Sequence, residues 1–187
     1  KTRALYRGIM EDIYSTYTTA ATGTAFPFTD VAETRWSYPY IKELYDAGVV
    51  SGTSATTFSP AANVTRAQFV TMLAGLAGAD VSNYPATPFR DVPEGAWYAP
   101  YVNWALANGI VSGTSAVTFS PDASITRQDM AVMLYSYTQR FQVHLQQQPV
   151  TPFTDAGSIA AYAQIAVQTL QRAGVISGMP DGSFQPL

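Results

Sequence analysis

Residues 58–68, Phe-Ser-Pro-Ala-Ala-Asn-Val-Thr-Arg-Ala-Gln, contain a turn followed by the start of an apolar helix. The same order returns at residues 119–129 as Phe-Ser-Pro-Asp-Ala-Ser-Ile-Thr-Arg-Gln-Asp, 61 positions further along the chain. The same offset of 61 relates Asp30 to Asp91. An offset that holds over several residue types indicates an internal repeat, so one repeated unit decides the fold.

A third copy begins at Phe153 and ends at Leu187, before its own Thr-Arg helix is due. The chain starts with Lys1-Thr2-Arg3-Ala4, which is the kind of segment that the third copy lacks. We therefore expect Leu187 and Lys1 to be spatial neighbours, within one chain or between two chains that swap. The alternative is that the chain was cut from a longer tandem array at arbitrary points. The predicted organisation is one module over residues 1–187, with complete repeats at 26–78 and 87–140 and a split repeat made of 152–187 plus 1–20.

Composition favours a globular binding module over several other classes. Apolar residues make up 47% of the 187 residues, enough for a packed core. A net charge of −3 with no basic run argues against nucleic-acid binding. The sequence has no cysteine, which excludes disulfides, and no apolar run near the ~20 residues of a membrane helix, which argues against membrane insertion. No cofactor is expected.

Apolar spacing predicts two helices in each repeat, so the expected fold class is all-α. The first helix carries apolar residues at i, i+3 and i+4 and ends at Gly48, Gly109 or Gly174. Its predicted buried stripe contains Tyr40, Ile41, Leu44 and Tyr45, then Tyr101, Val102, Ala105 and Leu106, then Ile165, Ala166, Val167 and Leu170. One helix pair cannot bury its own stripes, whereas three pairs around a common axis can.

The second helix of each repeat begins at a threonine cap, Thr65, Thr126 or Thr2. Gln68 and Asp129 occupy the third helical position, where a side chain can reach back to the cap.

An arginine follows each of these caps: Arg3, Arg66 and Arg127. A cation in the first helical turn costs roughly 0.3–1 kcal/mol against the helix dipole, so another interaction must offset it. One interpretation is an ion pair or hydrogen bond to the aspartate that opens a neighbouring repeat. The other is a site where the guanidinium binds a sugar or an anion. The two interpretations are compatible.

The ordered motifs resemble the S-layer homology repeats of bacterial surface proteins. The resemblance rests on Phe-x-Asp-Val, a Trp six residues after the Asp, Gly-(Ile/Val)-Val-Ser-Gly, Phe-x-Pro and the Thr-Arg helix start, and it covers nearly the whole chain. It implies a spindle-like, pseudo-trimeric array of helix–loop–helix repeats around a central helical bundle. It also implies anchoring at the bacterial cell surface through secondary cell-wall polysaccharide, commonly with pyruvylated sugars, bound in grooves between repeats.

The resemblance implies a set of ligand-binding positions along the repeats. The Thr-Arg motif supplies Thr65, Arg66, Gln68, Thr126, Arg127, Asp129 and Arg3, although none of the three copies has the family's glutamate. The opening aspartates Asp30, Asp91 and Asp155, the aromatic positions Trp36, Trp97 and Tyr162, and the loop glycines Gly52, Gly113 and Gly178 complete the set.

These residue types suit a sugar acid. An indole face stacks on a pyranose, an arginine pairs with a carboxylate, and a glycine admits close approach of the backbone. For Trp36 and Trp97 the alternative is plain core packing. Replacing Arg66 or Arg127 with alanine is expected to weaken wall binding and leave the fold intact.

Other functions have less support in the sequence. The single histidine, His144, lies in a helix tail that runs into a linker, and no catalytic constellation accompanies it, so we expect no enzyme activity in this chain. Two alternatives stay open. One is a protein–protein module that contacts other surface-layer proteins, and the other is direct binding of peptidoglycan.

Overall fold

A computed structural model of the chain describes residues 25–187. The predicted helix that starts at Thr2, the third arginine Arg3 and the closure between Lys1 and Leu187 lie outside the described residues. The split third repeat and the threefold arrangement therefore stay predictions.

The described chain is mainly helical, which confirms the predicted fold class. Its α-helices are α2 (Tyr38–Asp46), α3 (Arg66–Leu76), α4 (Ala99–Ala107), α5 (Arg127–Arg140) and α6 (Gln164–Arg172), with a short 3-10 helix, η1, at Ala156–Ser158. Within residues 25–187 the extended backbone amounts to isolated bridges, such as Thr65 with Ser124, and no sheet forms.

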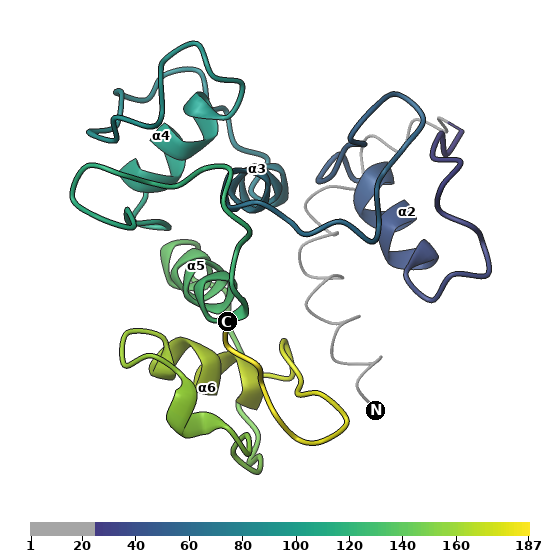
Figure 1. Cartoon of the computed structure of the whole chain (residues 1–187), viewed down its shortest axis with the longest axis vertical. Coiled ribbons are helices and arrows are strands. Elements are labelled where there is room, and N and C mark those ends of the chain that lie inside the picture. Colours follow the sequence, from purple (N-terminus) through teal and green to yellow (C-terminus); the bar gives the residue numbers. More distant parts are fainter. Residues whose placement is uncertain (1–24) are drawn as a thin grey trace.

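Helices pair across repeat boundaries. The second helix of one repeat packs against the first helix of the next, so α3 contacts α4 and α5 contacts α6. The two second helices, α3 and α5, also contact each other (Figure 1). Helix α2 instead packs with aromatic residues of its own repeat, Phe26, Phe28 and Phe58. Among the described helices, pairs within single repeats are thus replaced by pairs shared between neighbours, and the second and third repeats each share a core with the repeat before them.

The threonine caps form as predicted, but only one of the two boxes is complete. Thr65 accepts a hydrogen bond from the N–H of Gln68, and the Gln68 side chain accepts from the N–H of Thr65. Thr126 accepts from the N–H of Asp129. The Asp129 carboxylate does not return to the cap, because it is held by side chains of two other repeats.

Each start of a second helix also bonds to the turn of the next repeat. The N–H groups of Arg66 and Ala67 donate to the carbonyls of Ala123 and Pro121, and the N–H of Gln128 donates to Pro186. These bonds satisfy backbone donors that a helix leaves unpaired at its N-terminus. The Thr-Arg motif therefore joins one repeat to the next.

The predicted apolar stripes hold with two exceptions. Val102, Ala105, Val167 and Leu170 are buried, and the turn phenylalanines Phe119 and Phe184 are almost fully buried beside them. Tyr40 is exposed, and Ile165 is 68% exposed on the outer side of α6. In the third repeat Ile159 and Ala163 fill the core where Ile165 was expected. Gly48, Gly109 and Gly174 end their helices with φ near +70°, as predicted.

Candidate functional site

The opening aspartate of each repeat braces that repeat's own turn. The Asp91 carboxylate accepts hydrogen bonds from the N–H groups of Phe119 and Ser120, at 2.9 and 2.8 Å. Burial alone would raise the pKa of Asp91, but these two N–H groups lower it. Asp30 and Asp155 do the same in their repeats, and the N–H of Phe58 or Phe184 is the main cause of their lowered pKa. The carboxylates are therefore committed to the turn.

The loop glycines are required by close packing of the chain on itself. A Cβ at Gly113 would collide with the carbonyls of Ser115 and Thr118 and with the ring of Phe89. Gly52 faces the corresponding atoms of Ser54, Thr57 and Phe28, and Gly178 faces one carbonyl, that of Ser183, and the ring of Phe153. Only glycine fits these positions, whatever the loop binds.

Arg66 reaches from the first repeat into the second. Its Nε donates to the carbonyl of Phe119 at 2.9 Å, and its Cζ lies 4.9 Å from the centre of the Phe119 ring. Its Nη1 forms an ion pair with Asp129 Oδ2 at 3.0 Å. Burial lowers the pKa of Arg66, and Asp129 opposes that shift, so the cation stays charged in a largely buried position.

Arg127 repeats this geometry, but no acidic partner for it lies among residues 25–187. Its Nε donates to the carbonyl of Phe184 at 2.7 Å, and its Cζ lies 4.9 Å from the Phe184 ring centre. Its Nη2 donates to the carbonyl of Ser177 at 3.0 Å. Both arginines thus stack on the turn phenylalanine of the following repeat.

The predicted contact of these arginines with the opening aspartates is not what the structure shows. Asp30, Asp91 and Asp155 are occupied by backbone N–H groups, and Arg66 pairs with Asp129. Because Arg66 is buried and paired, its replacement is expected to cost stability as well as to change a groove. That alanine at Arg66 or Arg127 leaves the fold intact stays a prediction, with a loss of stability now expected beside it for Arg66.

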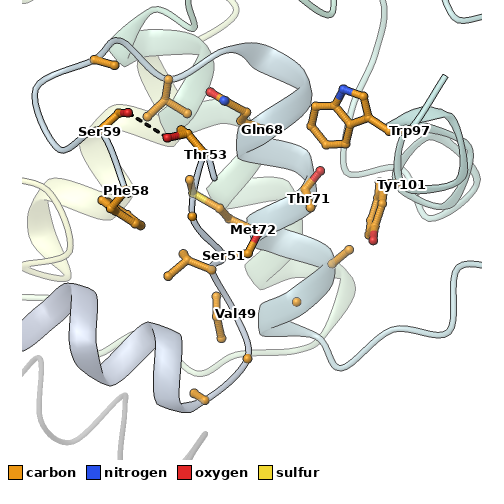
Figure 2. Close-up of a pocket in the computed structure, with 18 of the residues that line it drawn as sticks. Val49, Ser51, Thr53, Phe58, Ser59, Gln68, Thr71, Met72, Trp97 and Tyr101 are labelled. Atoms are coloured by element: carbon orange, nitrogen blue, oxygen red, sulfur yellow. Dashed lines mark hydrogen bonds between the residues drawn. The ribbon is translucent and has the colours of Figure 1, made fainter. Parts of the chain in front are cut away.

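A groove runs over α3 between the first two repeats, and we call it the first groove (Figure 2). Its volume is about 870 Å³. The loop of the first repeat forms one wall with Ser51, Gly52 and Thr53. Helix α3 forms the floor and Trp97 with Tyr101 the other wall. The floor residues are Gln68, Thr71, Met72 and Gly75. No acidic side chain lines this groove among the described residues.

Corresponding residues build a second groove between the second and third repeats. Its loop wall contains Ser112, Gly113 and Thr114, and Tyr162 stands where Trp97 stands in the first groove. Its volume is about 490 Å³. The floor, on α5, consists of Asp129, Val132, Met133 and Ser136, and Arg66 joins it from the first repeat.

The second groove is crossed by a chain of polar contacts. The hydroxyl of Tyr162 donates to Asp129 Oδ1 at 2.6 Å, while Arg66 holds Asp129 Oδ2. Burial, followed by the Asp129 hydrogen bond, raises the pKa of Tyr162 to about 12. We call the three side chains Arg66, Asp129 and Tyr162 the bridge.

The repeated aromatic residues are exposed, which contradicts the alternative of core packing. Trp36 is 79% exposed and Trp97 is 60% exposed, and Tyr162, which takes the same place in the third repeat, is 61% exposed. An exposed large ring at the same place in three repeats is the opposite of what a core position requires. These rings are available for stacking on a ligand.

The structure brings some of the predicted site residues together and separates others. Gly52, Gln68 and Trp97 meet in the first groove, and Arg66, Gly113, Asp129 and Tyr162 meet in the second. The predicted residues outside these two grooves are Thr65, Thr126, Asp30, Asp91, Asp155, Trp36, Arg127 and Gly178.

Several residues of the first groove were not predicted as site residues, among them Ser51, Thr53, Thr71 and Met72. Tyr101 was placed in a buried stripe, yet it forms part of the wall beside Trp97. Its spacing from Trp97, one helical turn, is the signal that places both on one face.

Residues 25–187 hold no cluster of His, Cys, Asp or Glu able to bind a metal ion. In the same part of the chain, every helix is too short or too polar to cross a membrane.

Helix pairs shared between repeats, with a groove at each of the two described junctions, define a repeat-built module with related grooves. The family model for the S-layer homology domain matches residues 27–70, 88–131 and 152–187. The chain belongs to the S-layer homology family, and its place is the bacterial cell surface.

Named relatives include both enzymes and surface proteins. The chain is 41% identical to an endoglucanase of Bacillus sp. (strain KSM-635) over 92% of its own length, but this covers only 18% of the endoglucanase. It is 26% identical to an S-layer protein of Bacillus thuringiensis subsp. finitimus over 99% of its length, and 21% of that protein is covered. It is 30% identical to a cellulosome-anchoring protein of Acetivibrio thermocellus over 75% of its length, covering 32% of that protein.

The chain therefore spans about a fifth to a third of the length of these relatives. The enzymes and the surface proteins match this chain along its repeat module. The chain is therefore a cell-surface anchoring module. The likeness to the endoglucanase carries no catalytic activity with it, because it covers so little of that protein.

Proposed function

We propose that the module binds secondary cell-wall polysaccharide, with a carboxylate-bearing sugar such as a pyruvylated residue seated in the grooves between repeats. The observation that carries the proposal is the repeated construction of the two described grooves. Each one places an exposed aromatic ring of one repeat opposite the hydroxyl-bearing and glycine-containing loop of the repeat before it.

The groove walls suit the two faces of a sugar ring. The Trp97 ring offers an apolar face for the C–H side of a pyranose. Across the floor, the exposed Ser51 offers a hydroxyl that donates and accepts hydrogen bonds, whereas the Thr53 hydroxyl is already bonded to Thr57 and Ser59. A pyranose held between a ring and a hydroxyl-bearing loop is the arrangement that this lining supports.

The charge of the grooves also bears on the proposal. The net charge of −3 disfavours a polyanion at long range, but screening leaves the local groove to decide the contact. The first groove has no acidic lining residue among the described residues, so it presents no like charge to a carboxylate. A repetitive polymer that engages several grooves at once gains affinity without any one groove being tight.

Two other ligands would use the same surface. The peptidoglycan itself is a sugar polymer that exposed rings could stack on, and a peptide of another surface protein could lie along the first groove. The larger protein that carries this module is proposed to be one that works at the cell surface, as the surface-layer and anchoring names of the relatives suggest.

Sedimentation of the protein with three wall preparations tests the proposal. The preparations are intact walls, walls stripped of their polysaccharide, and intact walls from which the pyruvyl ketals have been removed by mild acid. We expect binding to intact walls and loss of binding to the other two. Trp97→Ala should weaken binding to intact walls, and Ile165→Ala, which removes a similarly exposed side chain outside both grooves, should not. Full binding to stripped walls would contradict the proposal and favour peptidoglycan.

A further inference from the structure

The two described grooves have the same plan but differ in one connected set of residues. Gln68, Thr71 and Gly75 on the floor of the first groove become Asp129, Val132 and Ser136 in the second. Gln68 is neutral, and its Oε1 stays on its own helix cap. Asp129 is free of its cap and turns to Arg66 and Tyr162 instead. The shorter, charged Asp129 thus bonds to side chains of the groove, whereas the longer, neutral Gln68 bonds to its own helix cap.

We propose that the bridge Arg66–Asp129–Tyr162 is a latch that closes the second groove, so that the first groove is the principal glycan site of the described module. This inference rests on the proposed function. In this proposal Asp129 and Tyr162 do not contact the ligand directly. They are specificity-determining residues, because their bond decides whether the second groove accepts a sugar.

Geometry supports a closed second groove. Tyr162 belongs to the third repeat, Asp129 to the second and Arg66 to the first, so the bridge ties all three together across the groove. The second groove has a volume of about 490 Å³, against about 870 Å³ for the first. A sugar that bonds to Asp129 Oδ1 in the second groove would have to displace the Tyr162 hydroxyl.

Charge supports it as well. Both carboxylate oxygens of Asp129 are hydrogen-bonded, one to Tyr162 and one to Arg66. Arg66 is the only cation on the described lining of the second groove, and it is already paired with Asp129. The Arg66 guanidinium gives further contacts to the carbonyl and ring of Phe119. A ligand carboxylate would have to compete with Asp129 for Arg66 and would meet the charge of Asp129 when it did so. The described lining of the first groove imposes neither cost, and it contains no cation, so there a carboxylate would be bound through neutral groups.

Titration calorimetry with a soluble fragment of pyruvylated wall polysaccharide tests the latch. Trp97→Ala in the otherwise native chain should weaken binding by about tenfold, as loss of a central aromatic does at other interfaces. Tyr162→Ala should weaken it far less, because its groove is closed. Ile165→Ala is the matched control, since Ile165 is exposed and lines neither groove.

Opening the latch should restore binding where the first groove is disabled. In the Trp97→Ala background, Tyr162→Phe keeps the ring and removes the hydroxyl, and Asp129→Gln installs the residue of the first groove. Both double variants are expected to regain binding. Tyr162→Phe leaves the ion pair of Arg66 intact, so it remains informative even if Asp129→Gln lowers stability.

The bridge itself has a readout that needs no ligand. The changes in unfolding free energy for Asp129→Asn and Tyr162→Phe should be non-additive, since the two side chains share a hydrogen bond. Strictly additive effects would overturn the latch.

The titrations separate the failure of this inference from that of the proposed function. If the native chain binds the fragment but Tyr162→Ala weakens binding as much as Trp97→Ala, the latch is overturned and the proposed function stands. If neither substitution weakens binding, the latch is overturned together with the seating of the glycan in these two grooves. If the native chain binds no wall polysaccharide, the proposed function fails and the inference falls with it.

Discussion

The first and second grooves show how one repeated plan yields two different surfaces. Both have a floor on a second helix, a loop wall and an exposed ring from the following repeat. In the second groove the loop is also held from outside, since Arg66 bonds to Phe119 and pairs with Asp129. Arg3, which corresponds to Arg66 in the repeat, lies outside the described residues, so what can be compared is burial: Phe58 is only partly buried whereas Phe119 is fully buried. Among the described residues, Phe119 belongs to the largest core cluster, and Phe58 packs against a smaller cluster of the first repeat.

Truncation of the turn phenylalanines should give the largest difference between the grooves. Phe119→Ala removes a fully buried ring and is expected to lower the unfolding free energy by about 3–5 kcal/mol. Phe58→Ala should cost clearly less, because its ring is partly exposed. Urea unfolding followed by circular dichroism measures both. Equal losses would contradict the difference drawn between the two loops.

Removal of the arginines should have the next largest effect and again be unequal. Arg66→Ala leaves Asp129 without its cation and is expected to cost about 3 kcal/mol. Arg127→Ala removes hydrogen bonds to two carbonyls and a ring contact, with no carboxylate left behind, and should cost about 1–2 kcal/mol. The same urea titration serves as the measurement, and a larger loss for Arg127→Ala would refute this account of the ion pair.

Acid should weaken both loops through their aspartates. The folded-state pKa of Asp30 and of Asp91 is lowered, so their contribution to stability is complete above the unfolded pKa of about 3.9 and is lost as the pH falls through the folded value. Asp91→Asn should reduce stability at neutral pH and flatten its dependence on acid. Urea midpoints between about pH 6 and about pH 3 test this. An unchanged pH profile in the variant would exclude Asp91 as a source of acid sensitivity.

The helix-ending glycines should behave alike in both grooves, which makes them the control for the comparison. Gly48 and Gly109 share a φ near +70° and have open space where a Cβ would lie. Each change to alanine is therefore expected to cost about 1 kcal/mol, from backbone strain alone. Thermal unfolding of the two variants measures it. Clearly unequal losses of stability for Gly48→Ala and Gly109→Ala would contradict the equivalence of the two helix ends in the structure.

The sequence predicts local features of this molecule well. Thr65 and Thr126 cap their helices, and Gly109 ends one, because these effects depend on a few neighbouring residues. The family and the helical fold follow from the order of the repeated motifs.

Features that join separate repeats could not be predicted in the same way. Asp129 was placed in its own helix cap, yet Arg66 and Tyr162 from other repeats take its two oxygens. The exposure of the Trp97 side chain could not be predicted either, because tryptophan as a residue type is usually buried. Both outcomes depend on which repeat packs against which, and apolar periodicity within a repeat carries no information about that.

The most direct test of the account is the NMR signal of the Trp97 indole N–H during titration with a pyruvylated wall-polysaccharide fragment. The chain has three tryptophans, and Trp104, which is 2% exposed and lines neither groove, provides an internal control. The account predicts that the Trp97 signal shifts to saturation while the Trp104 signal stays in place. A Trp97 signal that does not move while the fragment binds would contradict the claim that the first groove is the glycan site.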